Sequence, residues 1–185
     1  MSTINQEAPA AEAPKSKADF IKLPAYPNSD SYVAVVVATN YLPQAVFDRT
    51  DEKTGAKTQV VAPGIEFFFG SLVNGKAVFA KSWPKLYSIN DRATYHKYYK
   101  AAVGKAPVAG SKPIDMVGKP VLLAIECQDK VSKKGTQYIV NKIVSVGSVP
   151  SVLLPAVPKL DALLPAFTDA INGGSNDNEP ADGPF

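Results

Sequence analysis

The chain has 185 residues, of which 45% are apolar, and its 20 Lys and Arg against 17 Asp and Glu give a formal net charge of +3. This length suits one domain of ordinary size with tails. Apolar runs such as 33–38 fall far short of the ~20 residues that span a bilayer, so no membrane association and a cytoplasmic location are expected. With a single cysteine and a single histidine, the chain is expected to have neither a zinc site nor an internal disulfide, and no cofactor is indicated.

The charge is distributed unevenly along the chain. Residues 1–150 carry 19 of the 20 basic residues and 12 of the 17 acidic ones, which gives this part +7 and the last 35 residues −4. Two interpretations stay open. The pattern fits a solvated surface with a solubilising tail, and it also fits a polyanion site with a separate protein-contact site.

Taken in chain order, residues 1–19 lack periodicity and are expected to form a flexible lead. Runs rich in valine and aromatic residues predict a strand at 31–42 and strands on both sides of a polar loop in 44–64. The clearest hairpin is 64–83, because Asn74-Gly75 favours the type I′ turn that joins antiparallel strands.

Residues 91–102 are expected to form a helix, with Asp91 as its N-cap and Tyr95, Tyr98 and Tyr99 at helical spacing. A second hairpin follows, in which a basic turn at 130–135 joins strands at 118–130 and 136–149.

This order predicts a mainly β fold over residues 20–150. We expect an OB-fold, a five-stranded Greek-key barrel with one helix between strands 3 and 4, with disordered termini. An SH3-like barrel or a small β-sandwich with one helix is the competing architecture, and the helix placement favours the OB-fold.

After Pro150, residues 151–171 are apolar but interrupted by proline. They are expected to form an arm that packs on its own barrel or on a neighbouring subunit, the second case giving a homo-oligomer. Residues 172–185 are expected to be a disordered acidic tail.

Strand alternation points to one candidate binding face. Phe79, Lys81 and Trp83 share one face of their strand, and Val78 and Ala80 share the other. The second face suits a core, whereas burial of Lys81 on the first would desolvate its charge without a partner. Aromatic and basic side chains together suit single-stranded nucleic acid, at roughly 1–3 kcal/mol for each stacked base. The alternative is that Trp83 anchors the core and Lys81 extends its ammonium to water.

In an OB-fold the loops after strands 1 and 4 flank the binding groove, and both are lysine-rich here. No pattern GxxxxGK[ST] or GxGxxG is present, so a binding protein rather than an enzyme is expected. The predicted nucleic-acid-binding residues are Lys53, Lys57, Phe67, Phe69, Lys76, Phe79, Lys81, Trp83, Lys85, Lys130, Lys133, Lys134 and Tyr138.

Two segments, GKAVFAKSWPKLYSI (75–89) and GKPVLLAIECQDKVSKKGTQYIVNKIVSV (118–146), carry a family resemblance. With the short helix between them, they resemble the OB-fold single-stranded-DNA-binding proteins encoded by tailed bacteriophages, over about residues 31–150. The resemblance implies a protein that coats and protects single-stranded DNA without sequence specificity. It also implies a role in phage DNA replication, recombination and repair in the cytoplasm of the bacterial host.

The C-terminal residues resemble the acidic tip of bacterial single-stranded-DNA-binding proteins, which commonly ends in Pro-Phe. In those families the tip recruits replication and repair proteins and can compete for the DNA groove; here Gly183 and the smaller number of acids depart from the pattern. The matching residues are Asp177, Glu179, Asp182, Pro184 and Phe185. Two other functions stay open: a structural or scaffolding protein that assembles through 151–171, and an RNA-binding or strand-annealing protein.

Overall fold

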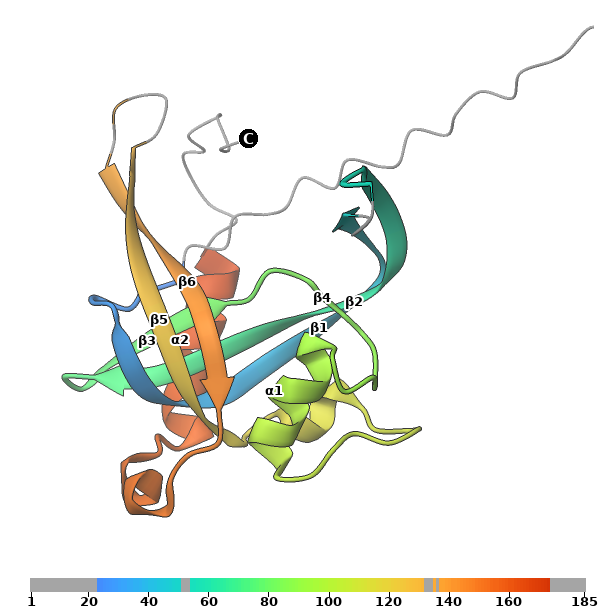
Figure 1. Cartoon of the computed structure of the whole chain (residues 1–185). Helices are drawn as coiled ribbons and strands as arrows, with labels where there is room; N and C mark the ends of the chain where they lie inside the picture. Colours follow the sequence, from blue (N-terminus) through green and yellow to red (C-terminus); the bar gives the residue numbers. More distant parts are fainter. Residues whose placement is uncertain (1–22, 51–53, 132–134, 136, 174–185) are drawn as a thin grey trace, which may run out of the picture.

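The computed structural model describes residues 23–50, 54–131, 135 and 137–173 (Figure 1). The fold is mainly β, as predicted, and its strands form a nearly closed antiparallel barrel in the order β3-β2-β1-β5-β6, with the short β4 beside β2. The strands are β1 (Asp30–Thr50), β2 (Lys57–Val73), β3 (Lys76–Lys81), β4 (Lys85–Leu86), β5 (Pro120–Val131) and β6 (Gln137–Gly147). Helix α1 (Thr94–Val103) and the 3₁₀ turn η1 (Pro113–Met116) precede β5, and η2 (Ser151–Ala156) and helix α2 (Leu160–Gly173) follow β6.

The β2–β3 hairpin forms where the sequence predicts it. Asn74 and Gly75 have φ values of +52° and +75°, and a type I′ turn needs positive φ at both of its central residues. The turn sets the register, so that Val78 and Ala80 point into the barrel core, also as predicted. Helix α1 covers one end of this core with the buried side chains of Tyr95, Tyr98 and Tyr99.

An N-terminal segment lies along the seam between the two edge strands, β3 and β6. The Phe79 N–H of β3 donates to the Pro24 carbonyl at 2.7 Å. The Asn141 side chain of β6 accepts from the Tyr26 N–H at 2.6 Å and donates to the Tyr26 carbonyl at 3.1 Å. The fully buried Tyr26 ring ends in a 2.8 Å hydrogen bond with Ser71. These contacts satisfy edge groups that would otherwise be unpaired.

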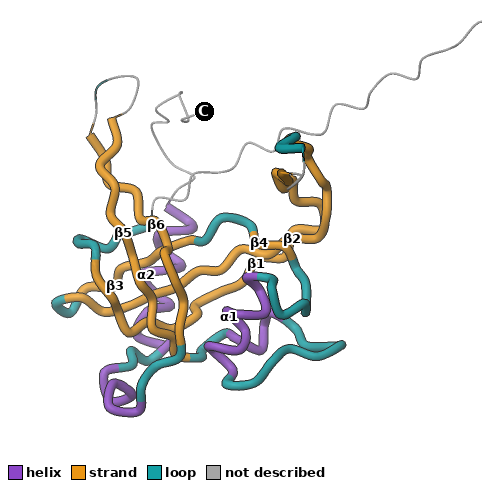
Figure 2. Tube along the Cα trace, in the orientation of Figure 1, coloured by secondary structure: helices purple, strands orange, loops and turns teal. Residues whose placement is uncertain are grey.

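Helix α2 packs on the outer face of β1, β2 and β3 (Figure 2). Leu163 and Phe167 are buried against Phe68 and Phe79. A Cβ at Gly70 would lie within 3.0 Å of the side chains of Val37, Leu163 and Phe79, so glycine is what permits this close approach. The predicted arm is therefore a helix on its own barrel, although Pro165 removes one backbone donor inside it.

Among the described residues, no helix is both long and apolar enough to cross a bilayer.

Candidate nucleic-acid interface

A bulge between β3 and β4 turns Trp83 outward. Phe68 of β2 pairs with Lys81, the last residue of β3, and Ile65 pairs with Lys85, the first residue of β4. The two β2 residues between these pairs, 66 and 67, therefore lie opposite three residues, 82–84. Ser82 points inward, where its Oγ accepts the Phe67 N–H at 3.0 Å. Trp83 is 78% exposed. Bulges of this kind redirect side chains beside functional sites.

Beside Trp83, the outer face is lined by a hydrogen-bonded polar group. Lys81 Nζ lies 2.9 Å from Glu66 Oε1, and Asn40 Nδ2 donates to Glu66 Oε2 at 3.0 Å. The Lys81 nitrogen also lies 5.7 Å from the centre of the Phe68 ring, within the range of a cation–π contact. The ion pair places an opposite charge beside the partly exposed Lys81 side chain, so this lysine is not an unpaired charge on the face.

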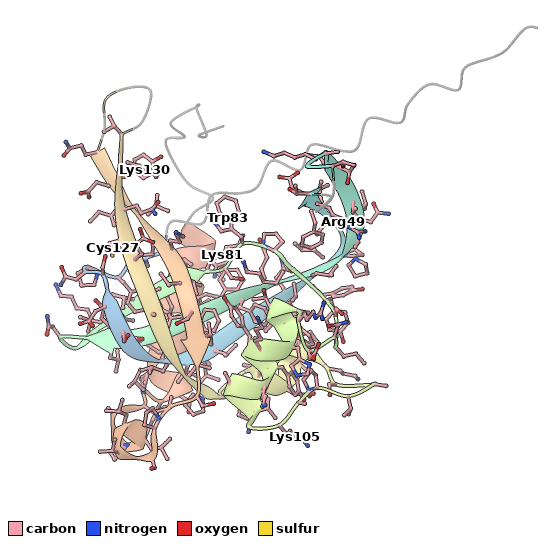
Figure 3. The ribbon with its side chains drawn as sticks, viewed as in Figure 1. Arg49, Lys81, Trp83, Lys105, Cys127 and Lys130 are labelled. Atoms are coloured by element: carbon pink, nitrogen blue, oxygen red, sulfur yellow. The ribbon has the colours of Figure 1, made fainter. Side chains whose placement is uncertain are left out.

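Two hairpins extend from the barrel on either side of this face. In Figure 3 Trp83 and Lys81 lie between the β1–β2 hairpin, marked by Arg49, and the β5–β6 hairpin, marked by Lys130. Lys57 pairs with Thr50 near the end of the β1–β2 ladder, and Lys130 pairs with Tyr138 near the end of the β5–β6 ladder. The arrangement places basic side chains on both flanks of an exposed indole.

Three predicted binding residues belong to the core, and the prediction is wrong for them. Phe67 and Phe69 are fully buried inside the barrel, where Phe67 stacks on Phe69 and on Tyr95 at ring separations of 6.1 and 6.4 Å. Phe79 is on the predicted outer face, but α2 covers it and leaves it 1% exposed. None of the three rings is available to a base.

Moving α2 away from the barrel to expose aromatic rings to bases would cost more free energy than base stacking would return. Exposing Phe68, Phe79, Leu163 and Phe167 would cost about 6–12 kcal/mol at 1.5–3 kcal/mol for each buried side chain. Two stacked bases would return only about 2–6 kcal/mol. We therefore assign α2 to the permanent fold and not to a removable cover.

The other predicted residues are scattered or fall outside the described part of the chain. Lys76 lies at the β2–β3 turn, about 17 Å from Lys81 at ~3.4 Å for each of five residues. Lys85 is half-buried on β4 and Tyr138 is half-buried on β6. Outside the described residues lie Lys53, Lys133 and Lys134 and the tail residues Asp177, Glu179, Asp182, Pro184 and Phe185.

The sequence prediction missed Glu66 and Asn40 as members of this face. Alternation along β2 places Glu66 on the same side as Phe68, and therefore beside Lys81 across the ladder. The β1–β2 register, which aligns Asn40 with Glu66, adds the third member. Trp83 follows Lys81 by two residues, so strand alternation alone assigns both to this side, whereas the irregular pairing at 82–84 has no simple sequence signal.

A few of the described groups have shifted pKa values. Burial raises the pKa of Tyr26, Tyr95 and Tyr98, all of which are core side chains. The pKa of Glu126 on β5 is lowered by a hydrogen bond from Gln128 and by Lys142, whose Nζ lies 3.1 Å from its Oε2. Within the described residues no three His, Cys, Asp or Glu side chains are grouped to hold a metal. The face can therefore offer stacking, hydrogen bonds and charge.

Comparison of the chain with protein-family models, with curated proteins and with solved structures found no match.

Proposed function

We propose that this protein binds single-stranded DNA on the face between its β1–β2 and β5–β6 hairpins, which would form the DNA groove, with Trp83 as the stacking residue. The strand order β3-β2-β1-β5-β6, with α1 following β4 and preceding β5, supports an OB-type barrel. OB-folds bind oligonucleotides on the face of strands 2 and 3, between the loops after strands 1 and 4. In this chain those loops belong to the two hairpins.

The exposure of Trp83 carries the proposal. An indole that is 78% exposed presents its ring faces to solvent, and proteins that bind single-stranded nucleic acid stack bases on aromatic side chains presented in this way. Each base stacked on such a ring contributes roughly 1–3 kcal/mol. The backbone next to Trp83 is anchored through buried Ser82, whose Oγ accepts the Phe67 N–H.

The surroundings of Trp83 favour binding without sequence preference. Stacking accepts every base, and the basic side chains Arg49, Lys57 and Lys130 on the flanking hairpins suit phosphates rather than base edges. We propose that such binding coats and protects single-stranded DNA during replication and recombination. The acidic C-terminal tip, by its resemblance to the bacterial tip, is proposed to recruit replication and repair proteins.

Substitution of Trp83 tests the proposal. The affinity of labelled oligo-dT, measured by fluorescence anisotropy at low salt, should fall about 5- to 150-fold in Trp83→Ala, the equivalent of roughly 1–3 kcal/mol. Trp83→Phe keeps an aromatic face and should retain most of the affinity. Equal affinity of the alanine variant and the unsubstituted protein would reject Trp83 as the stacking residue.

Competition experiments separate the remaining alternatives. Unlabelled single-stranded DNA should displace the probe at lower concentration than duplex DNA of the same length. An RNA oligomer that competes better than matched DNA would favour an RNA-binding protein. Absence of any salt-sensitive binding to either nucleic acid would favour a structural protein.

A further inference from the structure

The positive charge of the described residues is concentrated in the segment that contains α1 and η1. These residues include 14 Lys and Arg and nine Asp and Glu, an excess of five positive charges. Residues 91–119 alone hold six of the basic residues and two of the acids, an excess of four. We call the six cations the α1 surface: they are Arg92, Lys97, Lys100, Lys105, Lys112 and Lys119.

The cations of the α1 surface are exposed, and none of them forms an ion pair with another described residue. Neither of the ion pairs formed within the described residues, Lys81–Glu66 and Lys142–Glu126, involves any of them. The Asp115 carboxylate accepts instead from the Tyr99 hydroxyl at 3.1 Å and from the Lys112 N–H at 2.9 Å. The Tyr99 bond joins α1 to η1, and the Lys112 bond closes the turn that begins η1, so the lysines of α1 and η1 lie on adjoining elements.

The α1 surface differs in kind from the groove. The tyrosines of α1 are buried, so this surface presents no tyrosine ring for a base to stack on. Lys105 lies at the opposite end of the barrel from the two hairpins (Figure 3). A ligand here would be held chiefly by charge.

We propose that the α1 surface is a second nucleic-acid contact, which binds the phosphate backbone of single-stranded DNA beyond the part held in the groove. The inference rests on the proposed function, because it takes the groove ligand to be the same strand. Nucleic acid is favoured over an acidic protein segment because each phosphate contact releases condensed counterions. Isolated surface ion pairs with a protein contribute only about 0–1 kcal/mol each.

A double substitution that removes two positive charges from α1, compared with a matched control, tests the inference in the full chain. Lys97→Gln with Lys100→Gln removes two charges from α1, and Lys142→Gln with Lys159→Gln removes two from elsewhere as the control. Affinity for oligo-dT is measured across a range of salt concentrations. The short oligomer has about 8 nucleotides, within the 4–16 that one OB-fold covers, and the long one has about 30.

With the long oligomer, the α1 pair should reduce the slope of log affinity against log salt by about 1.4, since each contact with single strands contributes roughly 0.7. With the short oligomer the slope should not change, and the control pair should change neither. Identical slopes for the α1 pair and the control on the long oligomer would overturn the inference. Such a result would also be expected if the surface binds an acidic protein.

The fluorescence of Trp83 keeps the two proposals separate. If the short oligomer quenches Trp83 but the α1 pair has no effect on the slope, the groove stands and the second contact fails. If Trp83 does not respond but the α1 pair still lowers the slope, the second contact stands and the groove assignment fails.

Discussion

Lys81 and Glu66 form an ion pair of 2.9 Å on the outer face of β2 and β3, with the Glu66 side chain 11% and the Lys81 side chain 35% exposed. The pair places a carboxylate, and not only a cation, at the floor of the proposed groove. Asn40 holds the second oxygen of this carboxylate. The floor of the proposed groove therefore carries almost no net charge, and phosphates should be attracted more strongly to the basic side chains of the flanking hairpins.

Removal of the Glu66 charge should strengthen DNA binding. In Glu66→Gln the amide can still accept from Asn40, while Lys81 becomes free to meet a phosphate. The affinity for oligo-dT at low salt should rise severalfold, and its salt slope should steepen by about 0.7 for one added contact. The control is Asp161→Asn on the exposed side of α2, which makes the same change in net charge. An affinity no higher than that of the control would show that DNA does not approach this pair.

Truncation of Phe167 should destabilise the fold and leave the groove intact. The Phe167 ring lies 5.4 Å from the rings of both Phe68 and Phe79, so Phe167→Ala should lower the free energy of unfolding by about 3–5 kcal/mol in urea denaturation. Leu164→Ala, at a position 37% exposed on the same helix, should cost less. At a temperature where Phe167→Ala is folded, its DNA affinity should be unchanged. Much tighter binding would mean that α2 conceals a stacking site on Phe68 and Phe79.

The difference between the predicted and observed sites follows from the range of the interactions involved. Local signals were sufficient for the Asn74-Gly75 turn and for the alternation that places Val78 inward and Lys81 outward. The burial of Phe79 depends on Leu163 and Phe167, more than 80 residues further along the chain. The prolines within 151–171 favoured an interrupted arm. The apolar spacing of these residues was nevertheless sufficient for a helix, because packing of its apolar side against the sheet stabilises it.

The position of the N-terminal segment between β3 and β6 also depends on contacts between residues that are distant in sequence. Nothing local to Tyr26 indicates that its backbone pairs with the Asn141 side chain, 115 residues away in sequence. The Glu66–Lys81 pair, in contrast, could have been found by applying strand alternation to β2 as well as to β3. Its cross-strand register is fixed by the hairpin turn.

Alkaline pH should weaken the fold through Tyr26. Burial raises the pKa of the Tyr26 hydroxyl well above the usual value near 10, an effect that the Ser71 hydrogen bond only partly offsets. The folded state therefore holds this proton more tightly than the unfolded state. The associated stability is fully present below about pH 10 and is lost as the pH rises toward the folded-state pKa.

Tyr26→Phe should make the unfolding free energy fall less steeply above about pH 10, as followed by urea titrations at increasing pH. At neutral pH the same variant should lose roughly 1 kcal/mol with the Ser71 hydrogen bond. Tyr41→Phe, at a position 52% exposed, is the control and should follow the pH dependence of the unsubstituted protein. A Tyr26→Phe curve parallel to that of the control would show that this hydroxyl does not contribute to alkaline unfolding.

The fluorescence of Trp83 during titration with oligo-dT tests the central claim most directly, because it is the only tryptophan in the chain. At low salt we predict saturable quenching that weakens steeply as salt is added, since stacking and phosphate contacts form together. Emission that does not change while anisotropy of a labelled oligomer reports binding would contradict the account. It would place the DNA on some part of the molecule other than the groove beside Trp83.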